Sequence, residues 1–169
     1  MTPRPAAAEN YHPWSTYIAA REEARRRGDT RVGTDHLVLG LLHDPEIVSV
    51  LDVTLTAARD AVGSLDRQAL AAVGIAADLD SPLLPERELP KRPTVKAVFK
   101  DRLPLTPAAK NALRTAARPM RRRQHITPQQ LLIALLDGGA LDPAAILLAT
   151  LGIDVAAVRQ RLAAPPAAA

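Results

Sequence analysis

The four histidines could hold a metal ion by residue type, but their spacing argues against it. His36 and His43 are seven positions apart, which places them on nearly the same face of a helix. Seven residues of helix rise by ~10 Å, so the two rings cannot share one ion directly. His12 and His125 have no ligand-like spacing to either of them. We therefore assign the histidines to packing and surface roles and expect no metal.

Residues that could act as nucleophile and base form no recognisable set. Cysteine is absent, and no G-x-S-x-G occurs. Glu22 and Glu23 are adjacent, so a helix turns their carboxylates to different faces. No G-x-x-x-x-G-K-[ST] run is present, so no phosphate-cradling loop is predicted and ATP hydrolysis is excluded on motif grounds. The sequence predicts a protein that is not an enzyme and needs no cofactor.

Two runs of three arginines, at 25–27 and 121–123, could contact phosphate groups or an acidic partner. Aromatic residues make up 2% of the chain, too few for a base-stacking platform, and no known nucleic-acid module surrounds the runs. Cations at the end of a helix are also favoured by its dipole. The runs are therefore interpreted mainly as solvated helix ends, with a regulatory nucleic-acid-binding role as the alternative.

The elements that would position these residues occur twice. Residues 32–42 (VGTDHLVLGLL) recur as residues 126–136 (ITPQQLLIALL), an offset of 94 positions (126 minus 32). The same offset aligns Arg27 with Arg121. Both copies are apolar nearly all round, which is typical of a helix that is buried on all sides. The sequence thus predicts a pseudo-symmetric pair of helical units.

Start and stop signals divide each unit into four helices. Ser, Thr and Asp are favoured at the N-cap and proline at the first helical position, whereas glycine is favoured just after the last turn. The first unit is predicted to hold helices at 14–27 (closed by Gly28), from a Thr34 cap through Leu42, at 45–51 after an Asp44 cap, and at 55–62 after a Thr54 cap, with one further stretch at 64–73. The second is predicted to hold helices at 107–123 (kinked or interrupted at Pro119), from a Thr127 cap through Leu136, from an Asp142 cap to Gly152, and from an Asp154 cap to about Leu162.

A proline-rich segment separates the two units. Residues 80–104 contain five prolines among scattered charges, which is typical of a linker that is extended in places, although a short helix could form at 95–103. Because no segment alternates like a strand, we expect an all-α fold of about eight helices, a pseudo-twofold tandem repeat of two four-helix motifs in one compact domain. The predicted boundaries are a flexible 1–12, a first repeat at 13–79, the linker at 80–104, a second repeat at 105–163 and a flexible 164–169.

Composition and charge place few limits on partners. Hydrophobic residues make up 47% of the chain, enough for a core, and the net charge of +4 comes from mostly interspersed charges. Residues 1–10 lack the apolar stretch of a signal peptide, and no apolar run approaches the ~18 residues that a membrane span needs. The lack of cysteine suits a reducing compartment. We expect a cytoplasmic protein that does not enter a membrane.

Residues 20–28 (AREEARRRG), followed by 32–42, closely resemble the N-terminal repeat of Clp-type AAA+ unfoldases, especially the ClpC branch. The pattern in that family is E-E-A-R-x-x-G-x-x-x-[IV]-G-T-E-H-[LI]-L-L-G-L-L. Residues 105–110 (LTPAAK) look like the start of the family's second repeat, and 147–159 (LLATLGIDVAAVR) look like its end. The resemblance covers roughly residues 11–162 and implies the recognition domain of an unfoldase without its motor.

The resemblance also implies a ligand site at Thr34 and Asp35. In the resembling family the acidic residue of G-T-E-H takes part in binding phosphorylated arginine on substrate proteins, and Asp35 occupies that position. Its carboxylate could accept a bidentate bond from a guanidinium, while N–H groups at the helix start could hold an anion. The second repeat has the neutral Gln129 at the matching position, so any such pocket should be single and weaker. Plain helix capping is the alternative role.

A second implied site lies where the two long helices begin. In the family this region docks adaptors, peptides and some cyclic-peptide antibiotics. The positions that match it here are Tyr11, Trp14, Leu105 and Lys110. Lys110 matches a family lysine, whereas Leu105 stands where many members have phenylalanine. A seam between the two repeats is the alternative role.

Three functions stay open on these grounds. The first is a non-catalytic protein of the Clp proteolytic system that shares protein or peptide ligands with the unfoldase N-domain and acts as an adaptor or a decoy. Its partners would include the Clp unfoldase itself or a cyclic-peptide antibiotic. The second is a nucleic-acid or regulatory-protein binder that uses the arginine runs. The third is a structural module that docks on another protein.

Overall fold

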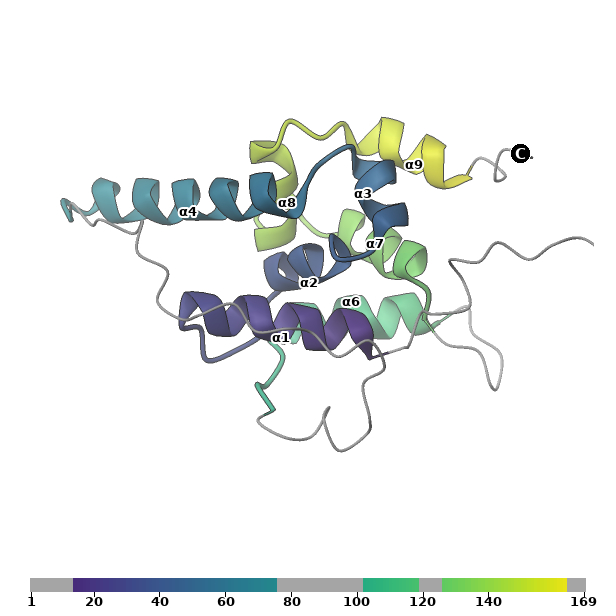
Figure 1. Cartoon of the computed structure of the whole chain (residues 1–169), viewed down its shortest axis with the longest axis horizontal. Coiled ribbons are helices and arrows are strands. Elements are labelled where there is room, and N and C mark those ends of the chain that lie inside the picture. Colours follow the sequence, from purple (N-terminus) through teal and green to yellow (C-terminus); the bar gives the residue numbers. More distant parts are fainter. Residues whose placement is uncertain (1–13, 76–101, 119–125, 164–169) are drawn as a thin grey trace, which may run out of the picture.

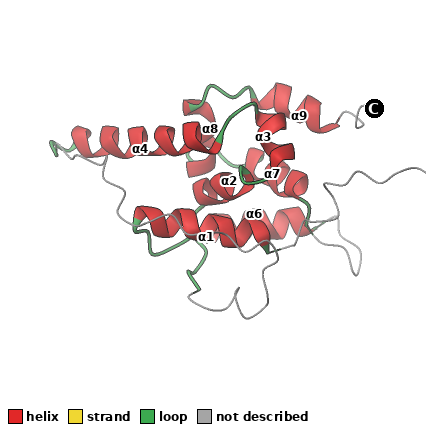
Figure 2. Ribbon diagram, in the orientation of Figure 1, coloured by secondary structure: helices red, strands yellow, loops and turns green. Residues whose placement is uncertain are grey.

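The computed structural model describes residues 14–75, 102–118 and 126–163. These residues form eight α-helices in two sets of four (Figures 1 and 2). The first set is α1 (Ser15–Arg27), α2 (Thr34–Leu41), α3 (Pro45–Leu51) and α4 (Leu55–Ala72). The second set is α6 (Pro107–Ala117), α7 (Pro128–Leu136), α8 (Pro143–Thr150) and α9 (Val155–Ala163). The described residues contain no strand, only one isolated parallel bridge between Val32 and Leu105, so the predicted all-α class is confirmed.

Most predicted helix starts are confirmed by the observed caps. Each capping side chain accepts a hydrogen bond from a backbone N–H two or three residues further on, which satisfies a donor that the first turn leaves unpaired. The residues that cap in this way are Asp44, Thr54, Thr106, Thr127, Asp142 and Asp154. Gly28 ends α1 at φ 75°, in the left-handed conformation that glycine adopts without strain.

Two predicted helix limits are wrong. α4 runs unbroken through Gly63 and Ser64 instead of ending near Val62. A glycine inside a helix costs only about 1 kcal/mol, so the helix-forming residues on both sides carry α4 across it. Thr34 is the first residue of α2 rather than its cap, because Gly33 holds the cap position with an extended backbone.

Other sequence predictions fall on residues that the structure does not describe. These are the flexible ends at 1–12 and 164–169, most of the linker at 80–104, the break at Pro119, and all but the last two positions of the helix proposed at 95–103. Those two positions, 102 and 103, are not helical. The described part of α6 ends at Ala117.

The central helix of the molecule is α2. It contacts α1, α4, α6, α7 and α8, and every residue of it except Asp35 is buried. The hydrophobic core takes buried apolar residues from all eight described helices, so both repeats share it. An almost wholly apolar helix needs cover on all sides, and the two repeats together supply that cover for α2.

The two sets interlock through an exchange of contacts. α3 of the first set packs on α9 of the second, and α4 of the first set packs on α8 of the second. The third helix of each set therefore contacts the fourth helix of the other. α2 and α7 meet in the layer between these four helices and α1 with α6 (Figure 1). This exchange gives the pseudo-twofold arrangement that the repeated sequence predicts. It also means that neither set closes its part of the core alone.

The sequence distance of 94 positions between equivalent residues of the two repeats holds only for the second helix of each set. The first residues of α2 and α7 are 94 positions apart (128 minus 34), whereas those of α1 and α6 are 92 apart (107 minus 15). The starts of α3 and α8 differ by 98 (143 minus 45), and those of α4 and α9 by 100 (155 minus 55). The second repeat therefore gains residues between successive helix starts, while the helix order stays the same.

α1 and α2 approach each other most closely at Gly40. A Cβ atom at this position would lie 2.6 Å from the carbonyl oxygen of Thr16 and 2.8 Å from the backbone nitrogen of Ala20. Both are backbone atoms of a packed helix, so a side chain fits only if α1 moves. The matching residue of α7 is Ala134. The glycine is thus a requirement of the first repeat alone.

Within the described ranges, no single helix is both long enough and apolar enough to cross a membrane. α8 and α9 pass that test only when they are taken together, and a bend of 99° separates them.

Candidate ligand-binding site

The candidate site lies on the loop between α1 and α2 and on the first turn of α2. The Val32 N–H donates to the carbonyl of Pro104 at 2.9 Å, and the Val32 carbonyl accepts from the Thr106 N–H at 2.9 Å. These bonds hold the loop against the segment that precedes α6. The Gly33 N–H donates to Nδ1 of His36 at 3.0 Å, which closes the first turn. The backbone at positions 34 and 35 is therefore fixed from both sides.

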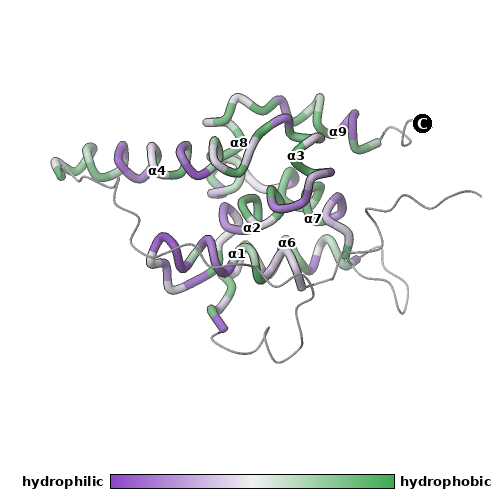
Figure 3. Tube along the Cα trace, in the orientation of Figure 1, coloured by the Kyte–Doolittle hydropathy of each residue, from purple (hydrophilic) through white to green (hydrophobic). Residues whose placement is uncertain are grey.

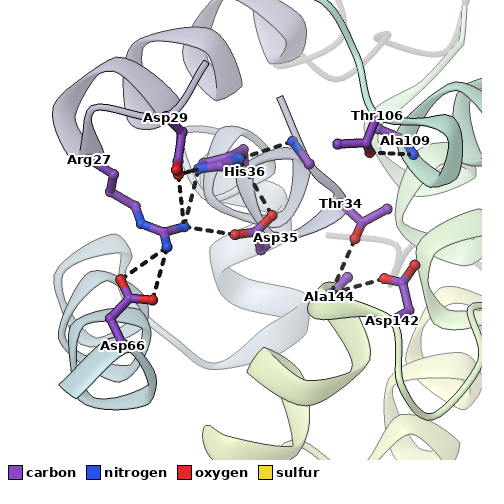
Figure 4. Close-up of polar contacts among 11 residues, drawn as sticks. Arg27, Asp29, Thr34, Asp35, His36, Asp66, Thr106, Ala109, Asp142 and Ala144 are labelled. Carbon is purple, nitrogen blue, oxygen red and sulfur yellow. Dashed lines mark hydrogen bonds and ion pairs between the residues drawn. The ribbon is translucent and has the colours of Figure 1, made fainter. Parts of the chain in front are cut away.

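Thr34 and Asp35 point in different directions (Figure 4). Oγ1 of Thr34 accepts a hydrogen bond from the backbone N–H of Ala144, in the first turn of α8, at 3.3 Å. Oδ1 of Asp142 accepts from the same N–H at 2.9 Å. Thr34 is 2% exposed, so its hydroxyl helps to cap a helix of the other repeat rather than its own. The structure places Thr34 in the contact between the repeats, whereas Asp35 is partly exposed.

Thr34 and Asp142 should compensate for each other when one is lost. We expect Thr34→Val or Asp142→Ala alone to cost about 1 kcal/mol of unfolding free energy, because the other residue still accepts from the Ala144 N–H. The double variant should lose more than the sum of the two, since a buried N–H is then left without an acceptor. Urea denaturation of the four proteins measures this coupling. Strict additivity would show that the shared N–H does not link the two side chains.

The carboxylate of Asp35 is held by Arg27, the last residue of α1 and part of its hydrophilic end (Figure 3). Nη1 of Arg27 lies 2.8 Å from Oδ2 of Asp35 and 3.4 Å from Oδ2 of Asp29. Nη2 donates to both carboxylate oxygens of Asp66 on α4, at 3.1 and 3.0 Å. His36 completes the group, which we call the Arg27 cluster: Arg27, Asp29, Asp35, His36 and Asp66. Figure 4 shows the guanidinium between the three carboxylates.

The Arg27 cluster contains more carboxylates than cations. Burial by itself lowers the pKa of Arg27, but the charges of Asp66, Asp29 and Asp35 outweigh it and raise the pKa above its usual value. Nε2 of His36 lies 3.0 Å from Oδ2 of Asp29 and 3.2 Å from Nη1 of Arg27. Three carboxylates thus share one guanidinium, so the cluster has a surplus of negative charge.

The interpretation of residues 25–27 as a solvated helix end is wrong for Arg27. Its side chain is 27% exposed and pairs with three carboxylates. The sequence analysis missed Asp66 because it is 39 positions from Arg27 and no local pattern links the two. The other arginine run, at 121–123, lies outside the described residues.

A second ion cluster, centred on the buried Glu23, ties α1 to α4. The carboxylate of Glu23 accepts from Nε of Arg59 at 3.0 Å and from Nη2 of Arg59 at 2.6 Å, and Nε2 of His43 lies 3.1 Å from its Oε1. Burial by itself raises the pKa of Glu23, but the hydrogen bonds and charges of His43 and Arg59 lower it to about 2. The sequence analysis gave His43 a packing or surface role, but it did not link His43 or Arg59 to Glu23. Across the described ranges, no three His, Asp or Glu side chains are grouped so that they could hold a metal ion.

At the position that matches Asp35, the second repeat presents an amide. Nε2 of Gln129 donates to Oε2 of Glu46 on α3 at 2.6 Å. This bond links the two repeats and leaves no carboxylate at that position. The described residues therefore build a carboxylate site at the start of α2 but not at the start of α7.

Trp14, from the second predicted site, lies at the N-terminal end of α1. The residue is 44% exposed, and its ring meets the Tyr17 ring edge-on, with the ring centroids 6.4 Å apart and an interplanar angle of 78°. The Tyr17 hydroxyl donates to the carbonyl of Leu103 at 2.9 Å. The ring pair is thus attached to the segment before α6. Tyr11 lies outside the described residues.

Leu105 and Lys110 lie at the start of α6. Leu105 is half-buried and forms the bridge with Val32, so it lies beside the loop that leads into the first turn of α2, where Asp35 stands. Lys110 is exposed on the second turn of α6. The two sites predicted separately from the sequence are therefore connected through the hydrogen bonds of Val32 with residues 104–106.

Comparison with known proteins gives a family and a fold. Residues 14–147 match the family model described as the Clp repeat (R) N-terminal domain. Among solved structures, the chain is similar to the crystal structure of the N-terminal domain of the caseinolytic protease associated chaperone ClpD from Arabidopsis thaliana. The two are 24% identical with a TM-score of 0.57, over 91% of this chain and 98% of that chain, which indicates a shared fold. No curated protein matches the chain.

Proposed function

Because this chain belongs to the Clp repeat (R) N-terminal domain family, we propose that it binds protein or peptide ligands of Clp unfoldase N-domains and acts as an adaptor or a decoy. N-terminal domains of this family are protein-interaction modules of Clp chaperones. The 169 residues contain both repeats and no G-x-x-x-x-G-K-[ST] motif. We therefore assign ligand capture, and no ATP-driven step, to these residues.

The observation that carries the proposal is the position of Asp35. It is the one residue of α2 that is not buried, and its side chain is 16% exposed within a cluster that has surplus carboxylates. In the family that the sequence resembles, the acidic residue at this position takes part in binding phosphorylated arginine. The pairing with Arg27 supports the choice, since these carboxylates already accept hydrogen bonds from one guanidinium. We propose phosphoarginine on a substrate protein as the ligand class.

The pairing of Arg27 with Asp35 also reduces the affinity that a ligand can reach. A guanidinium that reaches Asp35 must share that carboxylate with Arg27 or displace it. Asp29 and Asp66 would keep Arg27 paired after such a displacement. The competition within the cluster therefore lowers the affinity without unfolding the site. This competition is a physical reason to expect weak binding.

Asp35→Ala should weaken binding of a phosphoarginine peptide by about tenfold or more, the value of a hydrogen bond between charged groups. The melting temperature should change little, because Arg27 keeps two of its three carboxylate partners. Calorimetric titration and thermal melting of the same samples measure the two effects. A matched control is Asp137→Ala, which removes an exposed aspartate paired with Arg159 and should leave the affinity unchanged. A lower melting temperature with unaltered affinity would make Asp35 a structural residue only.

Adaptor and decoy differ in whether the chain also contacts the unfoldase. An adaptor should form a ternary complex with the ligand and the unfoldase on gel filtration. A decoy should withdraw ligand from the unfoldase and do so only at concentrations comparable to that of its target, by mass action. A chain that binds neither N-domain ligands nor the unfoldase would contradict the proposal as a whole.

A further inference from the structure

α6 buries only one narrow face. Its buried residues are Ala109, Ala112 and Ala116, at positions i, i+3 and i+7 of the helix. α1, the corresponding helix of the first set, buries eight of its 13 residues. α6 therefore leaves much more of its surface open to solvent than its counterpart does.

Three cations lie on the open side of α6. Lys110 and Arg114 of α6 and Arg118, its C-cap with a helical backbone, follow one another at intervals of four residues, and all three are exposed. At 100° per residue they lie roughly opposite the buried alanines, and they extend over ~12 Å of the helix axis. α6 contains no acidic residue between Pro107 and Ala117. We call Lys110, Arg114 and Arg118 the basic stripe.

The basic stripe is not neutralised within the part of the chain that the structure describes. None of its three side chains forms an ion pair or a hydrogen bond with a described residue. Arg27, Arg59 and Arg159, in contrast, each pair with at least one carboxylate. Like charges four residues apart on a helix repel each other, so the stripe slightly destabilises α6 until an anion binds.

We propose that the basic stripe is the docking surface for an acidic segment of a protein partner. This inference rests on the proposed function and deepens it by naming the charge of the partner. Carboxylates on alternate residues of an extended segment are ~6.6 Å apart, which matches the ~6 Å rise between successive members of the stripe. Leu105 is half-buried just before the N-terminal end of α6, and it gives the acidic segment an apolar neighbour.

A protein segment fits this surface better than a nucleic acid does. Three cations in one row could neutralise only a few phosphates, whereas nucleic-acid binders typically contact more of them and stack bases on aromatic rings. Aromatic residues make up 2% of this chain. A charged peptide of matching spacing needs neither feature.

The test uses a fluorescent peptide of alternating Glu and Ser residues. Its binding to the full chain is measured by fluorescence anisotropy at low salt. The peptide should bind, and added salt should weaken it because the contacts are exposed charges. Replacing the stripe by Lys110→Gln, Arg114→Gln and Arg118→Gln together should weaken binding by about tenfold, the sum expected for three exposed ion pairs. Arg114→Lys with Arg118→Lys should retain the affinity, because the charge is kept. Circular dichroism of each variant checks that α6 stays folded.

A matched control separates the stripe from net charge. Arg31→Gln, Arg67→Gln and Arg161→Gln together remove the same charge elsewhere on the surface and should leave peptide binding nearly intact. An equal loss in this control, or no peptide binding by the unaltered chain, would overturn the inference. Tighter binding of an oligothymidine of equal charge would also overturn it, in favour of a nucleic acid. Binding of a phosphoarginine peptide without binding of the acidic peptide would support the proposed function and contradict the role of the basic stripe. If neither peptide binds, both proposals are contradicted.

Discussion

Replacing Gly40 by alanine should lower the melting temperature by roughly 4–12 °C, the shift expected from about 2–3 kcal/mol in a chain of this size. Alanine normally favours a helix over glycine by about 1 kcal/mol, so the sign of this effect comes entirely from packing. The added methyl carbon would lie 2.6 Å from the Thr16 carbonyl oxygen, and neither backbone can yield without separating α1 from α2. Thermal melting by circular dichroism measures the shift.

Gly63→Ala is the matched control, since it makes the same change inside another helix. The nearest atom to a Cβ at Gly63 is a guanidinium nitrogen of Arg67 at 3.6 Å, an ordinary contact. This variant should gain about 0.5–1 kcal/mol from helix propensity. Two glycine-to-alanine changes should thus shift stability in opposite directions. Stabilisation by both would mean that α1 and α2 do not pack as closely as the structure has them.

Removing the charge of Glu23 should cost about 3 kcal/mol or more of unfolding free energy. Glu23→Gln keeps the shape of the side chain but leaves the guanidinium of Arg59 without its bidentate carboxylate at a buried position. Urea denaturation measures the loss. Asp137→Asn, which breaks an exposed pair with Arg159, should change stability by less than about 1 kcal/mol. Similar losses in the two variants would mean that the pair of Glu23 and Arg59 contributes no more to the free energy of unfolding than an exposed ion pair does.

The same carboxylate makes stability depend on pH in a defined window. The pKa of Glu23 is about 2 in the folded protein, below its ordinary value of 4.5, so the unfolded chain binds the proton more tightly. The contribution of Glu23 is therefore complete above pH 4.5 and is lost as the pH falls from 4.5 towards 2. The difference in unfolding free energy between the unaltered chain and Glu23→Gln should shrink by about 3 kcal/mol across that window. A constant difference would contradict the lowered pKa.

Local signals in the sequence predicted most of the helices and the class of the fold. Thr127-Pro128 and Asp142-Pro143 mark helix starts because the cap and the proline act within one turn, and the structure has both starts in place. The apolar sequence of 37–42 predicted a buried helix, and those residues are buried in the centre of the core. The sequence analysis missed the continuation of α4 through Gly63. Whether a helix continues through a glycine depends on the helix-forming residues on both sides, which offset the free-energy cost of that one residue.

Most of the candidate site depends on residues that are far apart in the sequence. The Thr34 hydroxyl accepts from a residue 110 positions away, so no local rule could separate its role from ordinary capping. The partner of Arg27 on α4 is 39 positions away. The sequence directed attention to Asp35 through the family pattern, but only the three-dimensional arrangement places the competing guanidinium beside it. The role of Asp35 in binding a ligand stays a prediction.

The exchange of contacts between the third and fourth helices gives this polypeptide the architecture of a two-subunit oligomer. Each repeat buries apolar surface of the other repeat, whereas an independent domain would bury such surface by itself. A single repeat expressed alone would expose apolar surface and should pair with a second copy of itself, so that the tandem fold is rebuilt as a homodimer. Two separately expressed repeats should likewise assemble into one particle, because the contacts that unite them are those that fold them.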